Sequence, residues 1–184
     1  MITTSARSQA GGNAAATQDS VDDILYESQH TRVWRRQLAD GTGSLICKEP
    51  LGPHALQRLH HEERILRQLA DIEGISRLSG EAHPTHFMAL QDSQGVSLSQ
   101  ALRQAPLALP ELLSLALQLA QIIAAMHHAG VMHKDINPAN ILLCGVLRKP
   151  ELIDFHLAST FIEEQPGFTH HHQIAGTLAY LAPE

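Results

Sequence analysis

The sequence predicts an α+β fold, in which a β-rich first part is followed by a mainly helical second part. Three observations predict it: a strand–turn–strand pattern over residues 24–48, a helical repeat of leucines after Pro53, and a long apolar helix over residues 110–128. Each signal is a hydrophobic period that matches one kind of element.

The β-rich part is predicted from residue types and turn chemistry. The segments ILYESQHTRVWRRQLA and SLICKEP carry β-branched and aromatic residues, and DGTGS between them is a turn signal. The stretch from Ile24 to Lys48 is therefore predicted to be a hairpin. Farther along, THFMALQD predicts a further strand.

A helix is predicted after the hairpin, with Pro53 near its start. Its leucines recur at roughly helical spacing, at Leu56, Leu59, Leu66 and Leu69. Glu62 lies three residues after Leu59 and four before Leu66, so it falls on the apolar stripe, whereas Glu63 falls to its side. A carboxylate on a buried stripe needs a cationic partner.

The strongest helix signal covers residues 110–128, with Pro110 suited to the first turn and Gly130 to a left-handed cap. Its polar residues form one narrow stripe of Ser114, Gln118 and Gln121. We therefore predict a core helix that is buried on most sides. Polar interruptions of the apolar stretch argue against a membrane span.

Composition narrows the functional class. The chain has 184 residues and a formal net charge of -6, which argues against nucleic acid as the main partner. Residues 1–22 offer almost nothing to bury and are predicted to be a disordered tail without an apolar signal segment. Cys47 and Cys144 are predicted to be buried free thiols in a reducing compartment, so we expect a soluble, cytoplasmic protein without direct membrane insertion.

Two short stretches place charges among apolar residues. In HKDINPAN, residues 133–140, Asn137 and Pro138 disfavour helix and strand, so a loop held by its apolar flanks is predicted. In LIDFHLA, residues 152–158, Asp154 ends an apolar strand. Oxygen ligands from Asn140 and Asp154 suit a hard cation such as Mg²⁺, which leaves its other positions to phosphates and water.

These stretches resemble protein-kinase motifs. HKDINPAN resembles the catalytic loop H-R-D-L-x-x-x-N, IDFHLA looks like the D-F-G segment, GTLAYLAPE resembles the end of an activation segment, and SLICK resembles the V-A-I-K strand. The resemblance implies a bilobal protein-kinase-like fold. It divides the chain into an N-lobe over residues 23–91, with one helix, and a partial, mainly helical C-lobe over residues 92–184.

The resemblance also implies roles at the reaction centre. Asp135 would accept or orient the proton of an attacking protein hydroxyl, and Asn140 and Asp154 would hold Mg²⁺ against the phosphates of ATP. Lys48, held by Glu62, would contact those phosphates.

Further residues would surround the base and support the site. Val33, Ile46 and Leu142 would sandwich the adenine, with a hinge near residues 91–93. His133 and Phe155 would pack beneath the site as structural supports.

Several positions depart from the kinase pattern. Tyr26, Ser28 and Thr31 stand at the three glycine positions of the nucleotide loop, which predicts weak or altered clamping. His156 replaces the D-F-G glycine. Lys134 replaces the arginine of H-R-D, and Asn137 stands where a phosphate-contacting lysine is usual. Such substitutions are similar to those expected in the kinase domains that open large bacterial hybrid sensor kinases.

The sequence stops at A-P-E, so we expect a fragment of a larger signalling protein, with further domains and with apolar surface exposed. His170, His171 and His172 are predicted to lie in a solvated loop, Thr169 is a phosphorylation candidate by position, and Thr177 is expected to support the catalytic loop.

Three functional hypotheses remain open. One is an ATP- and Mg²⁺-dependent serine/threonine protein kinase. A second is a catalytically weak or inactive pseudokinase that binds nucleotide or a partner. The third is a small-molecule kinase of related fold, such as a choline or aminoglycoside phosphotransferase, which the A-P-E segment disfavours.

Overall fold

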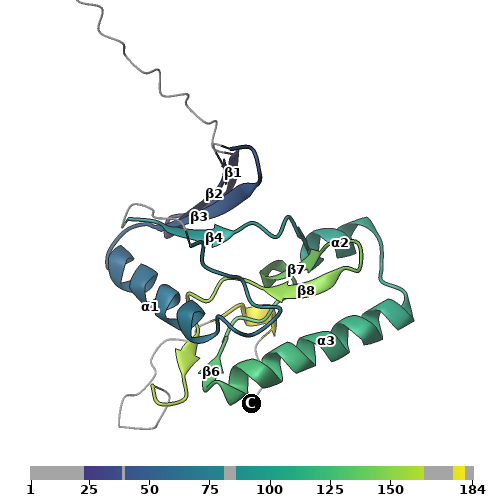
Figure 1. Ribbon diagram of the computed structural model, residues 1–184. Coiled ribbons are helices and arrows are strands. Elements are labelled where there is room, and N and C mark those ends of the chain that lie inside the picture. Colours follow the sequence, from purple (N-terminus) through teal and green to yellow (C-terminus); the bar gives the residue numbers. More distant parts are fainter. Residues whose placement is uncertain (1–22, 39, 81–85, 164–175, 181–184) are drawn as a thin grey trace, which may run out of the picture.

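The computed structural model describes residues 23–38, 40–80, 86–163 and 176–180. The predicted tail, Thr169, the three consecutive histidines and the A-P-E motif lie outside the described residues. The described chain has a β-rich part and a mainly helical part, joined by the segment that runs from β4 to α2 (Figure 1). The predicted α+β class is confirmed.

The first part is a four-stranded antiparallel sheet with α1 packed against it (Figure 1). Its elements are β1 (Asp23–Glu27), β2 (Thr31–Gln37), β3 (Ser44–Pro50), α1 (Ala55–Gln68) and β4 (Met88–Gln91). The strand predicted in THFMALQD is β4. The single hairpin predicted from Ile24 to Lys48 is instead three strands, because the chain also turns at Ser28, between β1 and β2.

The second part contains two helices and two small sheets. Its elements are β5 (Val96–Ser97), α2 (Leu98–Gln104), α3 (Leu109–His128), β6 (Val131–Met132), the 3₁₀ helix Pro138–Asn140, β7 (Ile141–Cys144), β8 (Lys149–Leu152), β9 (Ser159–Thr160) and the 3₁₀ helix Leu178–Tyr180. β7 lies between β5 and β8, and β6 pairs with β9. The predicted catalytic loop therefore lies between two short strands.

The core connects the two parts. Leu59 and Leu66 of α1 join one buried cluster with Met126 of α3 and Phe155. Leu56, predicted on the same stripe, is instead 54 % exposed. It belongs to the first turn of α1, and a spacing pattern cannot tell where the neighbouring surface ends.

The long helix α3 is the main correction to the sequence prediction. Within the described chain its buried residues are Leu115 and Met126, which pack on the core, whereas Leu109, Leu113 and Leu117 are 60–67 % exposed. The prediction of burial on most sides is therefore wrong. An apolar composition fixes what a helix gains by burial, but its neighbours decide which faces are covered.

By length and composition alone, α3 is the one helix among the described residues that is apolar enough to cross a membrane. Its contacts with β6 and β8, and the place of Leu115 and Met126 in the core, are those of a helix packed within a domain.

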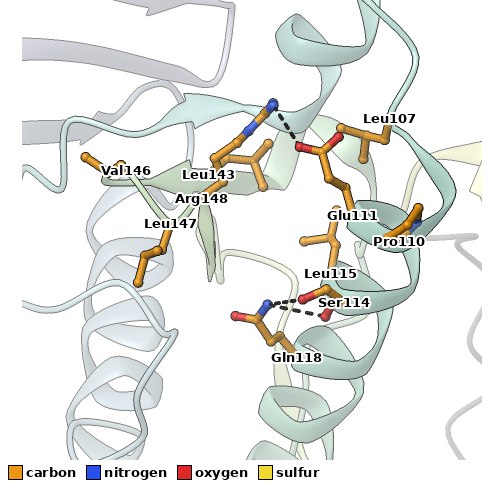
Figure 2. A pocket seen from close by; sticks show the side chains of 10 residues that line it. All are labelled: Leu107, Pro110, Glu111, Ser114, Leu115, Gln118, Leu143, Val146, Leu147 and Arg148. Carbon is orange, nitrogen blue, oxygen red and sulfur yellow. Dashed lines mark hydrogen bonds and ion pairs between the residues drawn. The ribbon is translucent and has the colours of Figure 1, made fainter.

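A cavity of about 370 Å³ opens between the first turns of α3 and the β7–β8 turn. Figure 2 shows Arg148 and Glu111 at this cavity, where their ion pair spans 3.9 Å, and Gln118 hydrogen-bonded to Ser114. None of its lining residues belongs to the predicted site.

Candidate active site

Lys48 is the centre of a buried ionic cluster that joins the two parts of the fold. It lies on β3, and its Nζ atom donates hydrogen bonds to both carboxylate oxygens of Glu62, each at 2.8 Å. The same Nζ atom lies 2.5 Å from Oδ1 of Asp154. The Lys48 and Glu62 side chains are only 9 % and 4 % exposed, so these charges interact with little screening by water.

The choice of Glu62 over Glu63 is confirmed. Glu62 lies on the buried face of α1 and also accepts a hydrogen bond from the backbone N–H of Phe155 at 3.1 Å. Glu63 instead pairs with Arg67 one helical turn away. Glu62 therefore ties α1 both to Lys48 and to the segment that carries Asp154.

The protonation of the cluster follows from opposing effects. Burial alone would lower the pKa of Lys48, but the charges of Glu62 and Asp154 outweigh it, and the pKa is raised. Burial alone would raise the pKa of Asp154, but His156 and Lys48 outweigh it and hold that pKa far below its usual range. Lys48 and Asp154 are therefore both charged at neutral pH.

His156, at the D-F-G glycine position, contacts the metal-binding candidate directly. Its Nδ1 atom lies 2.7 Å from Oδ1 of Asp154, and this hydrogen bond raises the pKa of His156. Asp154 itself has a left-handed backbone with φ of 66°. Lys48 and His156 both use Oδ1, and Oδ2 of Asp154 has no hydrogen bond to any described residue.

His133 holds the catalytic loop from below. It is 1 % exposed, its Nε2 atom lies 3.1 Å from the carbonyl oxygen of Ile153, and its Nδ1 atom accepts the N–H of Asp135. Its ring lies 4.6 Å from that of Phe155. Burial lowers the pKa of His133, which favours the neutral ring that this pattern of bonds requires. The prediction that His133 and Phe155 act as supports is confirmed.

Both carboxylate oxygens of Asp135 are engaged. Oδ1 accepts hydrogen bonds from the backbone N–H and the hydroxyl of Thr177, at 2.9 and 2.7 Å. Oδ2 accepts one from the side-chain amide of Asn140 at 2.8 Å. Asn137, in place of the usual lysine, donates to the Thr177 hydroxyl at 3.2 Å. The predicted support of the loop by Thr177 is confirmed.

The donor set fits Mg²⁺. The Asn140 amide nitrogen is turned toward Asp135, which leaves its amide oxygen for a ligand, and the Asn140 carbonyl accepts the N–H of Ile153, beside Asp154. One carboxylate and one amide oxygen, completed by phosphates and water, are a usual Mg²⁺ environment. No group of three or more His, Cys, Asp or Glu residues suited to a metal is found in the described ranges.

The predicted base-contacting residues come from both parts of the fold. Val33 on β2 pairs with Lys48, and Ile46 lies two residues before Lys48 on β3, so all three share one face of the sheet. Leu142 lies on β7, in the other part of the fold. All three predicted side chains are half-buried.

The Asp92 side chain, in the hinge, makes contacts that the sequence did not predict. Oδ2 of Asp92 accepts hydrogen bonds from Arg35 and Ser44, each at 2.6 Å, and Oδ1 accepts the N–H of Gln94 at 2.9 Å. The signal was present, because Asp92 follows an apolar strand just as Asp154 does.

The nucleotide loop between β1 and β2 is organised by Ser28. Its hydroxyl oxygen accepts the backbone N–H groups of His30 and Thr31, at 3.2 and 3.1 Å. All of β1 is exposed, including Tyr26. The predicted burial of the thiols holds for Cys47, which is fully buried, whereas Cys144 is only half-buried.

Comparison with known proteins agrees with this geometry. The family model described as "Protein kinase domain" matches residues 47–184, and the chain belongs to this family. The predicted resemblance to bacterial protein kinases, and the kinase fold with a β-rich N-lobe, are confirmed.

Three bacterial relatives illustrate the likeness. The serine/threonine-protein kinase PknH of Mycobacterium bovis is 30 % identical over 165 residues, which are 87 % of this chain and 26 % of the relative. The probable serine/threonine-protein kinase pknA2 of Bifidobacterium longum is 27 % identical over 180 residues, 97 % of this chain and 22 % of the relative. The serine/threonine-protein kinase PkaA of Streptomyces coelicolor is 45 % identical over 69 residues, 36 % of this chain and 12 % of the relative. The chain thus spans 12–26 % of the length of these relatives.

Proposed function

We propose that this domain transfers the γ-phosphoryl group of ATP to a serine or threonine hydroxyl of a protein substrate. The observation that carries the proposal is the bonding of Lys48 to both Glu62 and Asp154, which joins the strand, the helix and the D-F-G-like segment in one ionic cluster. The two carboxylates hold the ammonium group of Lys48 in one position, from which it would donate to a phosphate in exchange for its bond to Asp154.

The chain's own residues would divide the work. Asp135, at the edge of the loop, would orient the attacking hydroxyl, after its Oδ1 atom exchanges the Thr177 hydroxyl for that of the substrate. Lys48 would hold the phosphates of ATP, and Asn140 and Asp154 would hold Mg²⁺, which neutralises charge on the transferred group. ATP as donor is in keeping with a cytoplasmic location.

The test compares the full chain with Asp135→Asn, using radiolabelled ATP, Mg²⁺ and a generic protein substrate. We expect phosphoryl transfer to fall at least about 100-fold in the variant, because the neutral amide cannot accept a proton. Asp71→Asn, on the loop after α1, is the matched control and should keep its activity. Equal rates for Asp135→Asn and the unchanged chain would remove Asp135 from this role.

A second candidate is a pseudokinase that binds nucleotide or a partner and transfers nothing. It is favoured by the nucleotide loop without glycines and by Thr177, which occupies the carboxylate of Asp135. Thermal unfolding with millimolar ATP and Mg²⁺ separates the cases. A raised Tm without phosphoryl transfer supports the pseudokinase, and no change in Tm leaves only an interaction role.

A further inference from the structure

The Asp92 side chain forms a buried ionic contact that the proposed roles do not use. It follows β4 and is only 4 % exposed, whereas its partner Arg35 is 31 % exposed. A buried carboxylate is costly unless it is paired and hydrogen-bonded. Here Arg35 of β2, Ser44 of β3 and the backbone N–H of Gln94 supply these bonds. One carboxylate therefore joins two strands of the sheet to the hinge.

The register places this contact on the face of the sheet that carries Lys48. Val33 pairs with Lys48, Arg35 pairs with Ile46, and alternate residues of a strand share a face. Ser44 is four residues before Lys48 on β3, which is a separation of about 13 Å along the strand. The Asp92 contact thus lies beyond Ile46, at the end of this face opposite to the phosphate-binding lysine.

The hinge backbone has bonds on either side of Ser93. The N–H of Gln91 donates to the carbonyl oxygen of Arg77 at 2.9 Å, and Gln94 has a left-handed φ of 52° where its N–H meets Asp92. Within the described residues, no backbone hydrogen bond engages Ser93 itself. Its peptide groups are therefore available to a ligand, while Asp92 fixes the turn that presents them.

We propose that Asp92 is a positioning residue for the purine base of the nucleotide. Its carboxylate fixes the hinge to β2 and β3, so that the peptide groups around Ser93 meet the hydrogen-bonding edge of the base at a set distance from Ile46. This inference rests on the proposed function, because it concerns the base of the same nucleotide.

The charge state of Asp92 supports the assignment. Burial alone would raise the pKa of Asp92, but the hydrogen bonds from Ser44 and Arg35 outweigh it, and the pKa is lowered. The contact with Arg35 is therefore a charge-assisted hydrogen bond at neutral pH, which is stronger than a bond between neutral groups. An asparagine keeps the size of the side chain and loses this charge.

The experiment measures binding of adenosine, ADP and tripolyphosphate to the full chain by titration calorimetry, in the presence of Mg²⁺. For Asp92→Asn we expect about tenfold weaker binding of both adenosine and ADP, because the loss of the charged hydrogen bond to Arg35 loosens the hinge that meets the base. Binding of tripolyphosphate, which has no base, should be unchanged. Lys48→Met should show the converse: ADP and tripolyphosphate should bind more weakly, and the binding of adenosine should be unchanged.

Asp40→Asn is the matched control. The Asp40 carboxylate also caps a turn of the same sheet, through the backbone N–H and the hydroxyl of Thr42, but it is exposed and lies at the β2–β3 turn. All three affinities should be unchanged in this variant. Arg35→Gln should weaken the binding of adenosine as much as Asp92→Asn does. The double variant should bind adenosine no more weakly than either single variant, because both substitutions remove the same Arg35–Asp92 contact.

The outcomes separate the two proposals. Equal adenosine binding by Asp92→Asn and the unchanged chain would overturn the role of Asp92, while weaker ADP binding by Lys48→Met would still support the proposed function. An equal loss of affinity for all three ligands in Asp92→Asn would mean that the fold is damaged, and it would also overturn the proposed role of Asp92. An unchanged chain that binds neither adenosine nor ADP would end the proposed function and this role with it.

Discussion

The two ends of the phosphate-binding region are built in different ways. At the Lys48 end, the chain keeps the kinase residue types and buries them, with Glu62 only 4 % exposed. At the nucleotide loop, Tyr26, Ser28 and Thr31 stand in place of glycines, and Ser28 closes the turn with its own hydroxyl. The difference shows that a buried charge requires a charged partner because burial without one is costly, whereas an exposed turn can be closed by local hydrogen bonds.

The largest effect is expected from breaking the buried end with Glu62→Gln. Lys48 would keep only Asp154 as a charged partner, and the N–H of Phe155 would lose its charged acceptor. Removal of one partner from a buried ion pair typically costs about 3 kcal/mol of unfolding free energy. Urea denaturation would measure this loss, and phosphoryl transfer should fall about 100-fold because Lys48 is no longer held.

The adjacent Glu63 provides the control, because the same substitution there breaks only a pair within one helical turn, with Arg67, whose side chain is 63 % exposed. Glu63→Gln should cost less than about 1 kcal/mol and keep activity. Similar losses for the two variants would show that the buried cluster contributes no more than a surface ion pair.

The buried charges were the part of the site that sequence could predict. Glu62 was distinguished from Glu63 by its spacing from Leu59 and Leu66, and the cationic partner followed from the cost of burying a carboxylate. Strands were also predicted where β2, β3 and β4 lie, but the turn that makes β1 a separate strand was not, because the Ser28 hydroxyl closes it without a glycine. The spacing and the polarity of residues were therefore enough to predict those parts of the site that are buried.

The remainder depended on tertiary neighbours. The exposure of Leu113 and Leu117 on α3 is set by which elements lie beside the helix, and apolar composition carries no information on that. The bonds of Asp92 to Arg35 and Ser44 join residues 57 and 48 positions apart. Such a contact exists only once the register of β2, β3 and β4 is known.

A medium effect is expected at Glu151, a half-buried carboxylate that accepts a weak hydrogen bond from the Cys144 thiol. Burial raises the pKa of Glu151, helped by the nearby charge of Asp92. Because the folded-state pKa is the higher one, the folded state is favoured below the unfolded-state pKa, and this advantage is lost as pH rises through the folded-state value.

Glu151→Gln removes this pH-dependent penalty. The Tm of the variant should exceed that of the unchanged chain by a few degrees at pH 8, and the two should coincide near pH 4. Thermal unfolding followed by circular dichroism at both pH values would measure the difference. A variant that is less stable at pH 8 would mean that the charged form of Glu151 has a favourable partner, as Glu62 does.

The smallest effect is expected at the exposed end, with Ser28→Gly. The two N–H groups that now bond to the Ser28 hydroxyl would turn to water, so the unfolding free energy should fall by less than about 1 kcal/mol. Hydrogen exchange at the Thr31 amide should become faster.

A glycine at position 28 also allows closer approach of the backbone to phosphate, so ADP should bind a few-fold more tightly. Ser28→Ala is the control, since it removes the hydroxyl without that freedom and should leave ADP affinity unchanged. If both variants bind ADP equally, the missing glycines do not limit nucleotide binding, and the contrast between the two ends concerns folding alone.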